Sequence, residues 1–520
     1  MKFRSVRQAR GNSEFEERKC GMDTLKKYKE LLKEIGKLES ATSLLAWDER
    51  TYIPESAHEA RAQVLGKLSK MAFELSVSDE MGQYLEELTK EEVFQSLSEK
   101  DRASVYWVNH DYNRFKAIPP DLFEQYTIDR SKSEFAWEKA KAESNFEMFR
   151  PHLEKMVDYA RRFADIFGYE ENPYDALIED YEPGMTAREL KEIIEPLRKD
   201  LVSFLQELLN EGEPPDTSFL QGHFPKEKQK ELSTRALEAM HYDFKAGRLD
   251  VSAHPFTTKI GPGDVRITTR YIETELLPAL FGSMHEGGHG LYDQGIDKDL
   301  TWTGIDTGAS MGIHESQSRL WENYVGRSRA FWQFFYPQLQ EVFPRFEEVP
   351  VESFYRAVNK VEPSLIRVEA DELTYNLHIM LRFELEEGLV NGRVEVKDLP
   401  ELWNDAMNRY LGVTPPDDAH GVLQDVHWSG GMIGYFPSYM LGNLYAAQIF
   451  AAAKREIPSL EEKIASGDLL TLREWLREKI HRFGRMYAPK DILEKATGEG
   501  PNPNYFLEYV RDKFSDVYRL

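Results

Sequence analysis

Apolar residues recur at helical spacing through the first 170 residues of the chain. From Asp23 to Ala46 they fall three or four positions apart, the spacing that gathers side chains on one face of a helix. Further amphipathic segments follow at residues 58–73, 79–88, 92–112, 121–143 and 146–167. The pattern predicts a stack of helices separated by short breaks.

One later region favours a β-strand. Apolar and polar residues alternate over residues 264–271, after a Gly-Pro-Gly turn and just before the segment with the clearest chemistry. A second short strand is expected at residues 393–396, after an Asn-Gly turn. No segment has the composition of a linker, a repeat or a low-complexity tract. We therefore expect a mainly α fold with a small β-sheet in one large domain.

The most apolar stretch covers residues 432–453 and approaches the length of a membrane span. Polar residues and a proline interrupt it, and a helix that is apolar all round in a large protein is usually buried. We therefore expect a core helix and no membrane partner. The interrupting residues are Pro437, Ser438, Asn443 and Gln448.

Composition narrows the class of protein. The 520 residues carry 66 basic and 90 acidic side chains, a formal charge of −24, which repels nucleic acid and anionic membranes. The single cysteine, Cys20, excludes an intrachain disulfide and fits a reducing, cytoplasmic location. The first 21 residues are basic without a following apolar core, so we expect a disordered extension at 1–21 and the folded domain at 22–520, with Met22 an alternative start.

The strongest chemical motif is His285-Glu286-Gly287-Gly288-His289. Histidines four apart lie one above the other on a helix face, so both rings can reach one cation, and this is the H-E-x-x-H zinc pattern. Glu286 is the expected general base that takes a proton from water and passes it to the leaving amine. The alternatives are a chance match on an ordinary helix, or a Glu286 that only orients its neighbour.

Catalytic zinc usually takes three protein ligands. The metzincin continuation is excluded, because Tyr292 and Gly295 stand where glycine and histidine are required. Glu315, 26 residues after His289, is the expected third ligand, with His314 and Glu322 as competing candidates. The two glycines of the motif each cost about 1 kcal/mol in a helix. We expect them to permit a close approach of another backbone or of substrate.

Two further stretches carry donor groups. In residues 424–439, His427 and Tyr435 are candidate donors to an oxyanion, although a packed loop with a structural histidine is the simpler interpretation. Arg367 is expected to open a helix that runs to residue 387, and an arginine can grip a carboxylate with two parallel hydrogen bonds. A surface pair between Arg367 and Asp371 is the alternative.

These residues together resemble the carboxypeptidase Taq family of metallocarboxypeptidases. The similar blocks span nearly the whole chain after Met22. They are Leu45-x-Trp47-Asp48, Tyr174-Asp175-Ala176-Leu177, Tyr181-Glu182-Pro183-Gly184-Met185-Thr186, His254-Pro255-Phe256, Asp264-x-Arg266-x-Thr268, the zinc motif, His314-Glu315-Ser316, Ile366-Arg367, Ala370-Asp371-Glu372 and Gln424-Asp425-x-His427-Trp428.

The resemblance implies a saddle-like helical fold in which two lobes flank a deep cleft, as in neurolysin-like peptidases. It implies release of single C-terminal residues from peptides with broad preference, a homodimer, and zinc that cobalt can replace. The metal ligands would be His285, His289 and Glu315, with Glu286 as base. Arg367 would anchor the terminal carboxylate, Arg266 would be a secondary contact, and His427 and Tyr435 would contact the oxyanion or the substrate.

Two rival functions stay open at this stage. The first is a zinc endopeptidase or dipeptidyl carboxypeptidase of similar fold, which would differ in the distance from the carboxylate anchor to the metal. The second is a peptide-binding protein without activity. Loss of Glu286 or of a ligand would mark the second, and all four residues are present.

Overall fold

The computed structural model describes the backbone of residues 3–520 and the side chains of residues 21–520. The disordered extension expected at residues 1–21 falls almost wholly before the described side chains and stays a prediction. Of the chain, 69% is helical, which confirms the mainly α class.

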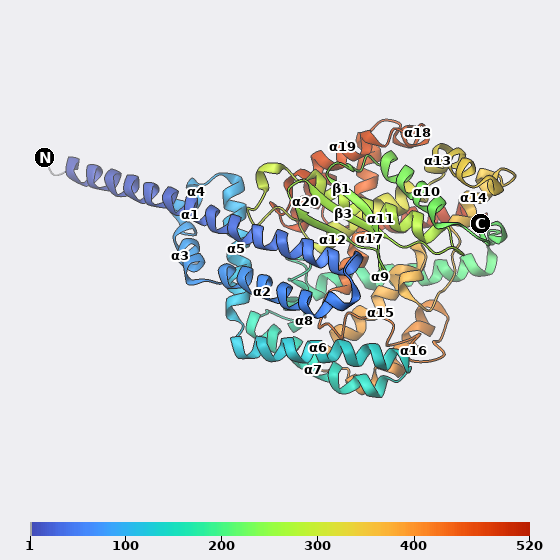
Figure 1. Ribbon diagram of the computed structural model, residues 1–520, viewed down its shortest axis with the longest axis horizontal. Helices are drawn as coiled ribbons and strands as arrows, with labels where there is room; N and C mark the ends of the chain where they lie inside the picture. The colour runs from blue at the N-terminus through green and yellow to red at the C-terminus, as the bar shows by residue number, and fades with distance from the viewer. Residues whose placement is uncertain (1–2) are drawn as a thin grey trace.

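The first helices form the stack expected from the periodicity, and α1 extends beyond the others at the N-terminal end (Figure 1). The segment expected at 92–112 is two helices. Ser98 starts the second by accepting a hydrogen bond from the Asp101 amide, while Leu97 is extended. The helices are α1 (Phe3–Thr51), α2 (His58–Ser76), α3 (Asp79–Leu88), α4 (Glu91–Ser96), α5 (Glu99–Ala117), α6 (Pro120–Ala142), α7 (Phe146–Phe167), α8 (Pro173–Ile178), α9 (Ala187–Glu211) and α10 (Lys226–Ala239).

A three-stranded sheet follows α10, in the order β1-β3-β2. It comprises β1 (Gly247–Val251), β2 (Thr257–Gly261) and β3 (Asp264–Thr269). The predicted strand is confirmed as β3, which lies in the centre, parallel to β1 and antiparallel to β2. β1 and β2 each bury only one residue, so their sequences lack the alternation that signals a strand. β2 forms one of the two edges and packs against α1 and α11 (Leu277–Gly295).

Helix α17 (Phe436–Glu456) is buried nearly all round and packs on α12 and α15, which confirms the expected core helix. Within the described residues, no helix is long and apolar enough to cross a membrane. The other elements of this half are α12 (Met311–Arg319), the π-helix η4 (Leu320–Gly326), α13 (Arg329–Val342), α14 (Val351–Val358), α15 (Glu372–Val390), α16 (Leu399–Leu411), α18 (Leu460–Ala465), α19 (Leu470–Lys479), α20 (Pro489–Thr497) and α21 (Asn504–Tyr518).

Two local predictions are wrong. Residues 393–396 form no strand, because the backbone turns there and enters the 3₁₀ helix η7 (Val396–Asp398). The long helix does not begin at Arg367, which lies in the separate 3₁₀ helix η6 (Arg367–Glu369). Asp371 caps α15 instead, by accepting hydrogen bonds from the Leu373 and Thr374 amides.

Candidate metal centre and active site

The metal region is formed by α11, α12 and η4. Its three expected ligands meet at one point, where one donor atom of each of His285, His289 and Glu315 lies within 4.8 Å of the others. Glu315 Oε2 is 3.6 Å from His285 Nε2 and 3.4 Å from His289 Nε2. Two atoms each about 2.1 Å from a tetrahedral zinc ion are about 3.4 Å apart. The donor set and its spacing therefore fit a divalent cation such as zinc.

The competing ligands lie behind the two histidines. Glu322 Oε2 is 2.9 Å from His285 Nδ1, and His314 Nδ1 is 2.6 Å from His289 Nδ1. These contacts occupy both Nδ1 atoms and leave the Nε2 atoms facing Glu315. Burial opposes ionisation of Glu322, but Arg319, His285 and Arg327 outweigh it and lower its pKa to about 2. Glu322 is therefore a carboxylate that fixes the ring of His285.

Glu315 is held from several sides. Arg319 Nε donates to its Oε1 at 2.7 Å, which leaves Oε2 towards the histidines. Gly442 of α17 supplies the space, because a Cβ there would lie 2.4 Å from Glu315 Cγ. At the start of α12, the buried Glu182 accepts from the Gly312 amide at 3.1 Å and from Tyr445 Oη at 3.0 Å. Burial raises the pKa of Glu182 to about 7.

Glu286 borders the sheet. Thr257 Oγ1 of the edge strand donates to its Oε2 at 2.6 Å and is 3.0 Å from its carbonyl oxygen. Among the described residues, Oε1 has no hydrogen-bond partner and is free to accept a proton from water. Glu286 forms no hydrogen bond with either ligand imidazole. This arrangement does not support the alternative in which Glu286 only orients His285.

The two glycines of the motif serve close packing. A Cβ at Gly288 would lie 2.6 Å from the Gln317 carbonyl oxygen, so the expected approach of another backbone is confirmed there. Gly287 instead meets side chains of α10, with Leu237 Cδ2 at 2.5 Å from an added Cβ. Together they let α11 pack closely against α10 and α12.

The anchor region is formed by η6, α15 and the loop of residues 424–435. Arg367 is buried, and its Nε and Nη2 donate to Asp425 Oδ1 at 3.1 and 2.9 Å. Its Nη1 donates to Tyr375 Oη at 2.9 Å. The alternative of a surface pair with Asp371 is therefore wrong. Two of the five guanidinium N–H groups have no partner within the described part of the chain.

Asp425 also accepts a hydrogen bond from Arg382, which is fully buried. Arg382 Nε donates to Asp425 Oδ2 at 2.7 Å. Burial opposes the charge of Asp425, but Arg382 and Arg367 keep the pKa of its carboxyl well below the usual range. Burial and Arg382 lower the pKa of His378 to about 3, and burial lowers that of His427 to about 4, so both rings are neutral at pH 7. The cluster thus holds two positive charges and one negative charge.

His427 and Tyr435 lie together beside this cluster, with ring centroids 5.5 Å apart. Tyr439 Oη is 3.2 Å from His427 Nε2, while the buried Nδ1 has no partner within the described residues. Burial and the nearby Glu315 raise the pKa of Tyr435 to about 12, so its hydroxyl keeps its proton. Tyr435 therefore has a hydrogen atom to donate near Glu315.

Tyr375 joins the two regions, and the sequence interpretation missed it. Arg319, which holds Glu315, stacks on the Tyr375 ring at 4.3 Å, and the hydroxyl of that ring accepts from Arg367. Arg382 and Thr257 were also missed. Tyr375 and Arg382 lie seven residues apart on α15, a spacing that places them on one face, but the other polar residues of this helix hide that signal.

Arg266 has a different environment from Arg367. Its Nε and Nη2 donate to the two oxygens of Asp264 at 2.8 and 2.7 Å, and its guanidinium covers the Trp47 ring at 4.4 Å. A bidentate carboxylate is therefore already present, and a substrate role for Arg266 stays a prediction.

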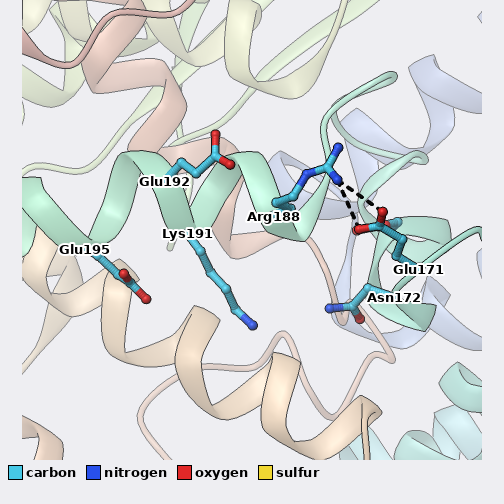
Figure 2. A pocket seen from close by; sticks show the side chains of 7 residues that line it. Glu171, Asn172, Arg188, Lys191, Glu192 and Glu195 are labelled. Atoms are coloured by element: carbon cyan, nitrogen blue, oxygen red, sulfur yellow. Dashed lines mark hydrogen bonds and ion pairs between the residues drawn. The ribbon is translucent and has the colours of Figure 1, made fainter.

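A polar pocket between α8 and α9 contains none of the expected site residues. Figure 2 shows acidic and basic side chains around it, with Arg188 directed at Glu171. The shortest N–O distance of this pair is 3.1 Å. Mutual pairing of this kind is typical of a solvated surface. We assign the pocket no role in catalysis.

Comparison with known proteins identifies the family. The family model of the carboxypeptidase Taq (M32) metallopeptidases matches residues 27–514. Carboxypeptidase 1 of Bacillus subtilis is 44% identical over 496 residues, which cover 95% of this chain and 99% of that protein. Thermostable carboxypeptidase 1 of Thermus thermophilus is 42% identical over 94% of this chain and 98% of its own.

Solved structures agree with this result. The M32 carboxypeptidase from Deinococcus radiodurans R1 superposes with a TM-score of 0.93 at 37% identity, covering 96% of this chain and 100% of the other. Metallocarboxypeptidase 1 of Trypanosoma cruzi gives 0.90 at 33% identity, with 96% and 100% coverage. The chain therefore belongs to the carboxypeptidase Taq (M32) family and is a metallocarboxypeptidase, a peptide hydrolase that acts at the C-terminus.

Proposed function

We propose that the enzyme releases single C-terminal residues from peptides of broad sequence, with His285, His289 and Glu315 as the ligands of a zinc ion. The observation that carries the proposal is the excess positive charge of the Arg367, Arg382 and Asp425 cluster, which is connected to Glu315 through Tyr375 and Arg319. A free C-terminal carboxylate supplies the missing negative charge, and a buried charge without a partner is costly.

Arg367 is the proposed anchor because it retains two N–H groups for the substrate carboxylate. When bound, zinc supplies Lewis acidity for the scissile carbonyl and for the attacking water. Glu286 accepts a proton from that water at Oε1 and transfers it to the leaving amine, while Thr257 keeps Oε2 in place. His427 and Tyr435 are the proposed contacts of the developing oxyanion or of the substrate backbone, and Tyr435 donates through its hydroxyl.

The remaining proposals follow from the family. We propose that cobalt can replace zinc, that the enzyme forms a homodimer and that it acts in the cytoplasm on peptides with a free C-terminus. Light scattering of the purified protein tests the dimer, and a monomer at working concentration would contradict it. We also propose Arg266 as a secondary substrate contact, weaker than Arg367 because its guanidinium is already paired with Asp264.

The anchor is tested with one peptide and its C-terminally amidated twin. Arg367→Ala should lower kcat/KM for the free peptide about 100-fold, mainly through KM, and change slow cleavage of the amide less than about threefold. Arg266→Ala is the matched control, because that arginine is already paired with Asp264 and should cost little on either peptide. An equal loss on both peptides would remove Arg367 as the anchor.

A zinc endopeptidase or dipeptidyl carboxypeptidase is the remaining alternative. Its products would be internal fragments or paired residues, so mass spectrometry of the same digests separates it from the proposed activity. Folded proteins should resist digestion in all cases if the substrate has to enter a deep cleft, as the family resemblance implies.

A further inference from the structure

Glu386 of α15 is fully buried and lies outside the site described above. Its carboxylate accepts three hydrogen bonds: from Trp428 Nε1 at 2.7 Å, from the Gly434 amide at 3.0 Å and from Tyr174 Oη at 2.5 Å. Two of these donors belong to the loop of residues 424–435. One buried carboxylate thus holds that loop at two points.

The two loop donors are the sequence neighbours of the two proposed donors to the substrate. Trp428 follows His427, and Gly434 precedes Tyr435. Gly434 has a φ of 97°, and a Cβ there would lie 3.0 Å from the Leu177 carbonyl, so the loop backbone is pressed against α8. Because Trp428 is also buried, neither contact has room to shift.

We propose that Glu386 is a positioning residue that fixes His427 and Tyr435 relative to the substrate. The inference rests on the proposed roles of those two residues. Arg382, one turn earlier on α15, independently holds the start of the same loop through Gln424 and Asp425. The helix therefore orients the whole loop from one face, at residues four apart.

Glu386→Gln tests the role with little change in volume. An amide offers one acceptor oxygen, so its NH₂ must face either Trp428 or the Tyr174 and Gly434 donors, and at least one contact is lost. Glu387→Gln is the matched control, because this buried neighbour accepts from Lys191 at 3.0 Å and Asn172 at 2.9 Å, away from the loop. Both partners line the pocket of Figure 2.

Glu386→Gln should lower kcat at least tenfold at unchanged metal content and nearly unchanged KM, and Glu387→Gln less than twofold. In the Tyr435→Phe background the loss from Glu386→Gln should shrink below about threefold, because the two residues act as one unit. Equal activity of the two glutamine variants, or a full loss in the Tyr435→Phe background, would overturn the proposal.

A second pair of variants tests the same role of Glu386 if the Glu386→Gln protein does not fold. Trp428→Phe and Tyr174→Phe each remove one donor to Glu386, but only the first removes a link to the loop. The proposal requires a lower kcat for Trp428→Phe alone, and equal effects would contradict it. If the wild-type enzyme releases no single residues, the proposed function is contradicted. This result is distinct from failure of the positioning role of Glu386, which only the variants test.

Discussion

The metal region and the anchor region are both buried and charged, but they are built in opposite ways. The metal region gathers carboxylates around two histidines: Glu315 in front of them and Glu322 behind His285. The anchor region gathers two arginines around Asp425. Arg319 and Arg327 balance the two carboxylates of the first region, whose imidazole and carboxylate donors suit a cation. The second region has a positive excess that suits a carboxylate.

This difference shows how one buried site can take two ligands of opposite charge. Tyr375 lies between the regions, because Arg319 stacks on its ring and Arg367 donates a hydrogen bond to its hydroxyl. Each region also depends on one buried glutamate, Glu182 below α12 and Glu386 beside the loop. Substitutions on each side should therefore have different signatures.

The largest effect is expected from Glu286→Gln in the metal region. Turnover should fall roughly 10³-fold, because the amide cannot accept the proton of the attacking water. Thr257 still has an amide oxygen as acceptor, so the site should keep its shape and its metal. Metal analysis beside steady-state kinetics checks both points. Substantial residual hydrolysis would exclude Glu286 as the base.

The two supporting glutamates should affect stability with a distinct pH dependence. Burial raises the pKa of Glu182 and of Glu386 to about 7, above the unfolded value of 4.5. Between pH 4.5 and pH 7 the folded state therefore binds more protons than the unfolded state does. As the pH rises through this range, the contribution of each glutamate to the free energy of unfolding falls by on the order of 3 kcal/mol.

Glu182→Gln and Glu386→Gln should each remove that pH dependence. The free energy of unfolding of each variant, measured relative to wild type from pH 4.5 to 8, should improve steadily up to pH 7 and level off above it. A difference that stays constant across this window would show that the glutamates titrate normally.

Within the metal region, the two ligand histidines should respond unequally to their supports. Glu322 contacts His285 directly, whereas Asp293 reaches His289 only through His314, whose Nε2 is 3.4 Å from Asp293 Oδ1. Glu322→Gln should weaken zinc binding about 10- to 100-fold and Asp293→Asn less than about tenfold. Competition with a fluorescent chelator measures both, and the reverse order would contradict the assignment.

The smallest effects concern the packing of α11. Gly288→Ala should destabilise the protein by about 1–3 kcal/mol, because its Cβ meets the backbone of α12. Gly282→Ala on the same helix meets nothing within 4 Å and should stabilise it by up to about 1 kcal/mol. Thermal unfolding compares them, and equal shifts would show that α11 and α12 are not in close contact.

The same comparison explains what the sequence can predict. The metal region could be predicted from local spacing, because helix geometry alone places His285 and His289 on one face. The anchor region could not. The burial of Arg367 beside Asp425 has no local signal, because Asp425 is 58 residues away and only the fold brings the two together. Asp371, the acidic residue near Arg367 in the sequence, caps helix α15 instead of pairing with Arg367.

The sheet gives a second lesson. Apolar and polar residues alternate in β3, so its sequence predicts a strand. β1 and β2 lack such a pattern and are strands because each pairs with β3, which lies between them. Thr257 follows from that pairing, because the position of the edge strand beside α11 decides which hydroxyl reaches Glu286. Long-range pairing of this kind leaves no local pattern.

The most direct test is mass spectrometry of one peptide and its C-terminally amidated twin, each incubated with the enzyme with and without a chelator. If the metal region and the anchor region act together, we expect a ladder of single-residue losses from the free C-terminus. The ladder should be absent with chelator and weak on the amidated peptide. Internal cuts, paired-residue losses or equal cleavage of both peptides would contradict the assignment of Arg367 as the anchor.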